Sequence, residues 1–363
     1  MSLPVIIDAQ ALSSVAAGSG TGTYVRGLLG GLAECTDLSI AAPCRADVVL
    51  PPNVHRRTVH RWSQRPRAAL MENALRLPLE LAVRRPRHAV FHNPSFHAPP
   101  AVGQPYVQTL HDVIPLVFDS PDLQALRARW RRFTPRYRRA AAVIAVSRFS
   151  ADEGIRVLGL DPGRVHVAHH GIDAAFVPSG TGPSDPPYLL TVGEFGLRKG
   201  TAEAFAVMDE LVDAGFPHRL VVAGQVHDAG RADLAALHAD ARHPERIDLL
   251  GYVPDLVSLY QGASGFLGTS RYEGFGLPAL EAMACGVPVV AFANSAVTEV
   301  VGTGGDLVPD GDVSAMAAAL RRILENPDLA DERRQAGLQH AAQFTWTRSA
   351  TLHAEVYRAV AAS

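Results

Sequence analysis

Short apolar runs alternate with longer amphipathic segments along the first half of the chain. Each run has the length of one buried strand, and the segments between them have the spacing of helices. Alternation of this kind is typical of a parallel sheet that is covered by helices. The pattern therefore predicts an α/β fold, with strands at residues 5–8, 89–91, 106–110, 143–146 and 165–169.

The pattern stops near Phe176 and restarts after a stretch rich in glycine, proline and serine. Residues 179–187 show no periodicity and are predicted to form a linker. Further strands are predicted beyond it at residues 188–192, 219–223, 248–250, 265–267 and 287–292. Since 363 residues are also long for one core, we expect two Rossmann-like domains, at residues 1–178 and 188–346.

A loop with several glycines follows the opening strand of each expected domain. These loops cover residues 18–22 and 193–200. Ligands of doubly wound sheets bind outside the carboxyl ends of the strands. Two such domains that face each other would enclose a central cleft, and we expect the ligand there.

Composition limits the possible classes of function. The formal net charge of −2 gives no general attraction to nucleic acid, so no nucleic-acid partner is expected. None of the three cysteines belongs to a CxxC pair, which favours a reducing cytoplasm over a disulfide framework or a zinc site. Residues 4–8 have no basic leader and are interpreted as a strand. No apolar run reaches the roughly 20 residues of a membrane-spanning helix.

The segment 271–290 carries the clearest chemistry. Gly274 and Gly276 permit a tight turn, and Pro278 suits the start of a helix because its missing N–H has no partner there. Gly286 is a typical helix end, and a proline two residues later prevents continuation. We therefore predict a turn followed by a short helix.

The start of this helix is a predicted anion site. The amides of Phe275, Gly276 and Leu277 would point out of the helix N-terminus, where a diphosphate fits. Glu281 leans back toward the same ligand, and Glu273 approaches it from the loop. Carboxylates accept hydrogen bonds from sugar hydroxyls. An alternative stays open, in which Glu281 only favours the helix dipole and Glu273 is a surface residue.

The same segment resembles the hallmark of glycosyltransferase family 4, retaining enzymes of the GT-B fold. Its two glutamates stand eight positions apart within Tyr-Glu-Gly-Phe-Gly-Leu-Pro-Ala-Leu-Glu-Ala-Met-Ala-Cys-Gly-Val-Pro-Val-Val. Further segments similar to the family lie at residues 111–112, 146–150, 192–200, 222–224 and 250–255. The resemblance implies a hexosyltransferase with an acceptor-side first domain and a donor-binding second domain. It also implies that the C-terminal helix, residues 347–363, packs back on the first domain.

Roles in donor binding follow from the resemblance. Glu281 would bind the ribose hydroxyls, Glu273 the hydroxyls of the donor sugar, and the amides of 275–277 the distal phosphate and sugar. Tyr252 and Val253 are assigned to the same donor-binding group.

Arg198 and Lys199 are expected to neutralise the diphosphate. Lys199 is the only lysine in the chain, although arginine is frequent, which suggests that a compact ammonium is needed there. The alternative is a solvated pair of cations. Many family members have an arginine directly after the Val-Gly of this loop, whereas this chain has Glu194, so a clamp of two arginines is not expected.

Two further groups come from the first half of the chain. His111 follows a predicted strand and, by the resemblance, approaches the donor sugar as a catalytic residue with Glu273 and Lys199; a purely structural histidine is the alternative. Gly20 and Gly22 lie in a loop similar to the Thr-Gly-Ile-Gly-Arg-Tyr loop of the mannosyltransferase branch, and are assigned to donor binding. This loop favours GDP-mannose over UDP-linked donors.

Residues 126–139 are basic and interleaved with aromatic residues. Such a segment is able to make peripheral contact with an anionic membrane at the inner face, or to bind an acidic acceptor. A solvated helix with arginines along its surface is the favoured alternative, and Pro135 is expected to interrupt any long amphipathic face.

Other classes of function fit the sequence less well than sugar transfer. A nicotinamide-dependent oxidoreductase needs a GxGxxG turn directly after the first strand, but about ten residues separate Asp8 from Gly18. A pyridoxal-phosphate phosphorylase needs a lysine that forms a Schiff base with the cofactor. The only lysine is Lys199, and its place in the expected phosphate-binding loop argues against that role. A non-catalytic descendant that binds sugar nucleotides stays open. We therefore expect a metal-independent enzyme without cofactor that uses a nucleotide diphosphate sugar and a carbohydrate, lipid-linked or glycosylated small-molecule acceptor.

Overall fold

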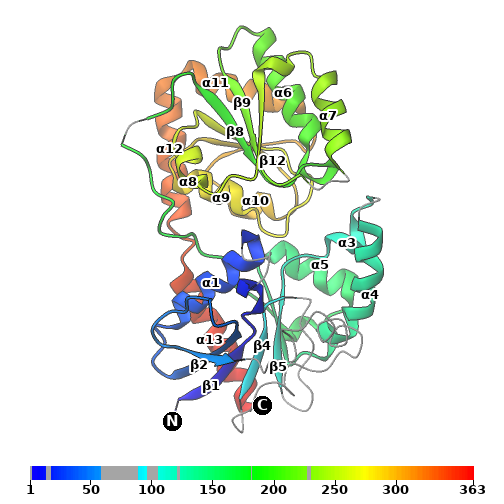
Figure 1. Cartoon of the computed structure of the whole chain (residues 1–363), viewed down its shortest axis with the longest axis vertical. Helices are drawn as coiled ribbons and strands as arrows, with labels where there is room; N and C mark the ends of the chain where they lie inside the picture. The colour runs from blue at the N-terminus through cyan, green and yellow to red at the C-terminus, as the bar shows by residue number, and fades with distance from the viewer. Residues whose placement is uncertain are drawn as a thin grey trace. The chain divides into compact units, whose positions relative to one another are not determined.

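The computed structural model of the chain forms two compact units (Figure 1). It describes residues 2–13, 18–58, 89–95, 105–120, 123–180, 182–226 and 230–363. The first unit comprises Met1–Gly171 with Phe344–Ser363, and the second comprises Ile172–Gln343.

The unit boundaries differ from the expected domain limits of 178 and 347 by a few residues. The predicted linker is tied to the second unit, because the Ser184 N–H donates to the Gly262 carbonyl at 2.9 Å. The residues just before the linker also contact the second unit, since Gln261 Nε2 donates to the Val177 carbonyl at 2.8 Å. The break in the chain therefore falls at residue 171 and not at 178.

The first unit contains a parallel seven-stranded sheet in the order β3-β2-β1-β4-β5-β6-β7. The order reverses between β1 and β4, as in doubly wound folds. The strands are β1 (Leu3–Ile7), β2 (Leu38–Cys44), β3 (Val54–Thr58), β4 (Val90–Asn93), β5 (Tyr106–Leu110), β6 (Ala142–Ala145) and β7 (Val165–Val167). The helices are η1 (Gln10–Ser13), α1 (Gly20–Leu32), α3 (Ile114–Val117), α4 (Gln124–Arg139), α5 (Arg148–Leu158), η6 (Pro162–Arg164) and α13 (Trp346–Ala362).

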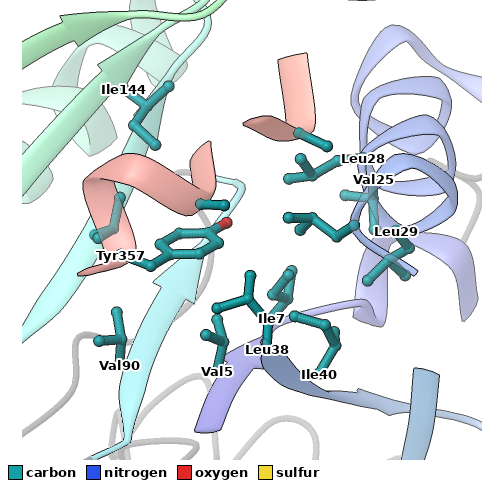
Figure 2. Packing of buried hydrophobic residues seen from close by; sticks show 14 of the residues in the cluster. Val5, Ile7, Val25, Leu28, Leu29, Leu38, Ile40, Val90, Ile144 and Tyr357 are labelled. Atoms are coloured by element: carbon teal, nitrogen blue, oxygen red, sulfur yellow. The ribbon is translucent and has the colours of Figure 1, made fainter. Parts of the chain in front are cut away.

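The C-terminal helix α13 belongs to the core of this unit. Figure 2 shows the Tyr357 ring among Val5 and Ile7 of β1 and Leu28 of α1. All four side chains are completely buried. Helices α1 and α13 also approach closely, since a β-carbon on Gly31 would lie 2.5 Å from the Trp346 carbonyl oxygen. The sheet therefore binds a helix that is more than 300 residues away along the chain.

Two expectations for this unit were wrong in detail. Residues 20–24 form the first turn of α1 and not a loop, so Gly20 is the first helical residue and Gly22 is buried within the helix. Helix α4 does not end at Pro135 but continues for one more turn, to Arg139. Burial of Trp130 and Tyr137 stabilises α4 on the sheet, and their rings stack 5.5 Å apart.

The second unit contains a parallel six-stranded sheet in the order β10-β9-β8-β11-β12-β13. Its order reverses between β8 and β11. The strands are β8 (Tyr188–Val192), β9 (Arg219–Ala223), β10 (Ile247–Gly251), β11 (Gly265–Gly268), β12 (Val289–Phe292) and β13 (Asp306–Val308). The helices are η7 (Leu197–Lys199), α6 (Thr201–Asp213), α7 (Arg231–Asp240), η9 (Pro244–Arg246), α8 (Leu256–Gln261), α9 (Leu277–Ala284), α10 (Ser295–Val301), α11 (Val313–Glu325) and α12 (Pro327–Ala341).

The predicted α/β fold with two Rossmann-like halves is confirmed. Every strand predicted from an apolar run is present, with ends that differ by two residues at most. The short helix after the glycine turn is α9, and Gly286 adopts the left-handed φ of 71° just beyond its end. Strands β2, β3 and β13 were not predicted.

Candidate active site

A pocket opens in the second unit where the strand order reverses between β8 and β11. It holds about 530 Å³ of empty space, which includes solvent at its mouth. Its walls come from the ends of these two strands, the loops that follow them, and the starts of α6, α9 and α10. This is the position at which doubly wound sheets bind their ligands. Among the lining residues are Gly193, Glu194, Lys199, Thr201, Thr269, Ser270, Glu273, Gly276, Pro278 and Val297.

The loop after β8 places Lys199 at this pocket. Gly193 and Gly196 have φ values of 153° and 143°, which side chains rarely adopt. A β-carbon on Gly193 would lie 3.2 Å from Lys199 Cε, so the glycine leaves room for the lysine to cross the loop. The Thr269 hydroxyl donates to the Lys199 carbonyl at 3.0 Å, which fixes η7 against the loop after β11.

Lys199 and Arg198 converge on Glu273. Lys199 Nζ lies 2.5 Å from Glu273 Oε1, and Arg198 Nη1 lies 3.6 Å from Glu273 Oε2. The side chain of Lys199 is 15% exposed, that of Arg198 21% and that of Glu273 14%. Burial acts to raise the pKa of Glu273, but the two cations outweigh it and hold the pKa below its usual range. Glu273 is therefore an anion at neutral pH.

Arg198 is also held from other directions. Its Nη1 donates to the Tyr272 carbonyl at 3.3 Å, and its Nη2 lies 3.8 Å from Glu194 Oε2. Glu194, which stands where many family members have arginine, thus faces the cation and lines the pocket. Arg198 and Lys199 are the two basic residues of this loop.

The N-terminus of α9 borders the pocket. Gly276 precedes the helix with a φ of 107°, and Pro278 occupies its second position. First-turn amides of a helix have no acceptor within the helix. Of the three residues whose amides were expected to bind phosphate, Gly276 lines the pocket, and Phe275 and Leu277 do not. Phe275 is 5% exposed and anchors the turn in the core.

Glu281 lies one turn further along α9. Its Oε2 accepts a hydrogen bond of 2.9 Å from the hydroxyl of Tyr260, a fully buried residue of α8. Burial raises the pKa of Glu281 to about 7; the Tyr260 hydrogen bond lowers it, and the nearby Asp173 raises it. Glu281 does not line the pocket between β8 and β11.

Two predicted donor residues lie apart from the charged group. Tyr252 and Val253 follow β10, at the same carboxyl edge of the sheet, but neither lines the pocket. Tyr252 is 62% exposed.

The first unit holds the remaining predicted residues. His111 follows β5, and its Nε2–H donates to the Pro94 carbonyl at 2.8 Å. Its ring meets the ring of Tyr24 edge to face, with centroids 5.0 Å apart. Burial lowers the pKa of His111, and the bond to Pro94 offsets only part of this effect. On α1, Gly20 lies about one turn before Tyr24 and Gly22 two residues before it.

Two family models together match most of the chain. The model "Glycosyltransferase Family 4" matches residues 18–176, and "Glycosyl transferases group 1" matches residues 175–340. D-inositol 3-phosphate glycosyltransferase 1 of Catenulispora acidiphila is 31% identical, over 70% of this chain and 67% of that protein. The chain belongs to glycosyltransferase family 4. O-antigen chain mannosyltransferase B of Escherichia coli is also similar, with 29% identity over 76% of each chain.

Solved structures show the fold of this family 4 glycosyltransferase. Sucrose-phosphate synthase from Thermosynechococcus elongatus aligns with a TM-score of 0.75 and 22% identity, over 99% of this chain and all of that one. Anabaena HepE, solved in complex with UDP and glucose, aligns with a TM-score of 0.70 and 18% identity over 98% and 100%. These neighbours are GT-B proteins, and the chain has this fold.

Several residues in or near the glycosyltransferase pocket were missed by sequence reasoning. Thr269 and Ser270 line the pocket and directly follow β11. Asn294 and Ser295 lie two and three residues after β12 and hydrogen-bond to the backbone of the loop that carries Glu273, without lining the pocket themselves. The general rule that ligands bind at the carboxyl ends of strands was a sufficient signal for all four. It was applied to the glycine loops alone, because glycine and charge are easier to recognise in a sequence than a short polar side chain.

Proposed function

We propose that this glycosyltransferase moves a hexose from a nucleotide diphosphate sugar to a carbohydrate, lipid-linked or glycosylated small-molecule acceptor, with retention of the anomeric configuration. The observation that carries the proposal is the group of Lys199, Arg198 and Glu273 beside the N-terminus of α9. Two cations, one carboxylate and a helix N-terminus suit a ligand that is anionic at one end and hydroxylated at the other.

The charge balance supports a phosphate near Lys199. Glu273 forms ion pairs with both Lys199 and Arg198. A diphosphate brings a stronger acceptor for Lys199 and Arg198, which frees the Glu273 carboxylate for sugar hydroxyls. Cations positioned at the leaving diphosphate act where negative charge develops, so their stabilisation is largest in the transition state. His111 is proposed to contact the donor sugar.

GDP-mannose is the donor that we favour, and a UDP-sugar is the second candidate. Mannosyltransferases of Escherichia coli and Rhizobium leguminosarum are among the relatives, at 29% and 34% identity. The Anabaena protein was solved with UDP, but it is less similar in sequence. A panel of nucleotide sugars, followed by release of free nucleotide, tests this choice. Release of UDP alone would replace the donor, and release from no member of the panel would favour a non-catalytic binding protein.

Metal independence is part of the proposal. A diphosphate site that relies on Lys199, Arg198 and backbone amides needs no divalent cation. Activity is therefore expected to survive exhaustive treatment with EDTA. A loss that only magnesium or manganese restores would contradict this.

We also propose peripheral contact of α4 with anionic membranes at the cytoplasmic face. Within the described residues, no helix is long and apolar enough to cross a bilayer. Arg129, Arg131, Arg132 and Arg139 of α4 are exposed, whereas Trp130 is buried in the core. Any attraction to the membrane is thus electrostatic and not due to aromatic insertion.

A further inference from the structure

Ser295 has an unusual backbone conformation at the first position of α10. Its φ is 44°, and no other non-glycine residue in the described part of the chain has a positive φ. This left-handed region disfavours any residue with a β-carbon. Strain of this kind persists only where the surroundings impose it, and it is frequent at functional sites.

The side chain of Ser295 holds the backbone of Glu273. The Glu273 N–H donates to Ser295 Oγ at 3.0 Å, and the N–H of Ala296 donates to the Glu273 carbonyl at 3.3 Å. Both polar atoms of the Glu273 backbone are therefore bound by two consecutive residues of α10. The contact joins segments that are 22 residues apart along the chain.

Asn294 orients the serine hydroxyl. Ser295 Oγ–H donates to Asn294 Oδ1 at 2.8 Å, so the hydroxyl has a lone pair directed to Glu273 and its proton directed away. Asn294 Nδ2 in turn donates to the Ser270 carbonyl at 3.0 Å and to Asp310 Oδ1 at 2.6 Å. The loop that carries Glu273 is thus fixed at Ser270 and at Glu273 itself.

Helix capping does not explain the serine. The residue at the N-cap of α10 is Asn294, and its side chain makes no capping hydrogen bond. A glycine at position 295 would adopt the same φ without strain. What serine adds over glycine is the Oγ atom that accepts from Glu273.

We propose that Ser295, oriented by Asn294, is a positioning residue for the Glu273 carboxylate. The inference rests on the proposed function, in which Glu273 binds the hydroxyls of the donor sugar. With its backbone bound on both sides, the carboxylate stays 2.5 Å from Lys199 Nζ and 3.6 Å from Arg198 Nη1. The same first turn of α10 also contributes Val297 to the pocket wall, so one element positions the glutamate and shapes the cavity.

Comparison of Ser295→Ala with Ser295→Gly tests the proposal. Both variants lose Oγ, but only glycine relieves the backbone strain, so the glycine variant is expected to melt at the higher temperature. Each is expected to lower kcat roughly tenfold, as for one lost hydrogen bond, while nucleotide affinity stays within about twofold. Ser314→Ala is the matched control, because it removes an exposed serine hydroxyl from α11, outside the network of Asn294 and Ser295.

Two results would overturn the proposal. One is a wild-type kcat in Ser295→Gly, since the hydroxyl would then have no role. The other is a kcat that follows melting temperature across the three variants, as a purely structural role requires. Glu273→Gln separates the proposal from the proposed function: if it lowers kcat and Ser295→Ala does not, only the serine is excluded. A wild-type kcat in Glu273→Gln would exclude both roles.

Discussion

Lys199 occupies a position in which an arginine fits poorly. Its side chain crosses Gly193, its ammonium lies 2.5 Å from Glu273, and it is only 15% exposed. A compact ammonium makes point contacts with phosphate oxygens, whereas a planar guanidinium needs more room and a different geometry. The position of Lys199 therefore differs from that of a general surface charge.

Replacement of Lys199 is expected to lower turnover strongly. Lys199→Ala should reduce kcat/KM by a factor on the order of a hundred or more, like the loss of other preorganised donors to a developing charge. Lys199→Arg should restore only part of it. Arg321→Ala is a suitable control, because Arg321 forms an exposed ion pair on α11 that contributes about 0–1 kcal/mol. Normal donor turnover by the alanine variant would exclude the role, whatever its melting temperature.

Glu281 predicts a pH dependence of donor affinity. Its pKa of about 7 means that it gains a proton as pH falls through neutrality. We propose that Glu281 binds the ribose. Only its carboxylate form would accept hydrogen bonds from both ribose hydroxyls, so affinity for a nucleotide sugar should rise between pH 6 and pH 8. A charge-assisted hydrogen bond contributes about 1.5–3 kcal/mol, and Glu281→Gln should lose it and show a flat profile.

Titration calorimetry with the nucleotide sugar, in the absence of acceptor, measures this effect. The sugar-linked diphosphate has no group that titrates near pH 7, unlike the free nucleotide. Tyr260→Phe serves as a second variant, because the Tyr260 hydrogen bond lowers the pKa of Glu281, so its loss should move the midpoint to higher pH. An affinity for the wild-type protein that does not change with pH would remove Glu281 from the ribose.

Elements with a clear apolar pattern were predictable, and those without one were not. Strands β3 and β13 lie at the sheet edges. The first reads Val-His-Arg-Arg-Thr, and the second has three residues. Strand β2 contains Pro43, which argues against a strand in sequence reasoning. The turn before α9 was predictable from glycine and proline chemistry, but the contact between Lys199 and Glu273 spans 74 residues and required the fold.

The docking of α13 depends on a buried network of hydrogen bonds. Donor and acceptor can be assigned in only one way along this network. His353 Nδ1–H donates to the Ser349 carbonyl at 2.7 Å, which in a neutral ring leaves Nε2 as an acceptor. The Tyr24 hydroxyl therefore donates to this nitrogen at 2.7 Å. Its oxygen in turn accepts from the Thr109 hydroxyl at 2.9 Å.

The same reasoning extends the network to the sheet. Since the Thr109 proton is directed to Tyr24, its oxygen accepts from His92 Nε2–H at 2.8 Å. His92 Nδ1 then accepts from the Tyr357 hydroxyl at 2.7 Å. Every step requires neutral imidazoles. Burial supplies this condition, because it lowers the pKa of His353 to about 4 and that of His92 well below its usual value.

Acid should therefore destabilise the first unit. The folded pKa of His353 is lower than the 6.5 of an ordinary histidine, so between about pH 6.5 and pH 4 the unfolded chain binds a proton that the folded chain does not. Stability is lost as pH falls through this window. His353→Gln removes one such group, and the slope of unfolding free energy against pH should decrease by up to about 1.4 kcal/mol per pH unit.

Urea unfolding of the full chain at several pH values between 4 and 7.5 measures this slope. Tyr24→Phe is the companion variant: it removes the hydroxyl that donates to His353 but keeps the titrating ring. It should lower stability at pH 7.5. If His353→Gln had the same slope as the wild-type protein, His353 would not be a neutral residue of the folded core.

At the scale of the whole molecule, charge is distributed unevenly. The chain has a formal net charge of −2, yet α4 contains seven arginines and no acidic residue. Phe133 lies between two of them, with Arg136 4.2 Å and Arg129 5.7 Å from its ring centroid. A single helix thus presents a local positive field on a chain whose other residues are together clearly acidic.

This distribution predicts salt-dependent binding to anionic vesicles. Basic residues near such a surface contribute about 1 kcal/mol each at moderate ionic strength, so replacement of Arg131, Arg132 and Arg139 by glutamine should weaken binding on the order of a hundredfold. All three side chains are exposed, and none lines the donor pocket, so turnover with a soluble acceptor should not change. Cosedimentation with vesicles of anionic and of neutral lipid measures the effect.

The control is a triple variant with the same loss of charge on other helices, Arg321, Arg322 and Arg348 to glutamine. If net charge alone determined binding, both triple variants would lose affinity equally; if α4 is the contact, only the first does so. Raised salt should weaken the binding of the wild-type protein to anionic vesicles toward that of the α4 variant, since exposed charges are screened within about 10 Å at 0.1 M. Equal binding to neutral and anionic vesicles would contradict an electrostatic contact, because arginines alone give no affinity for an uncharged surface.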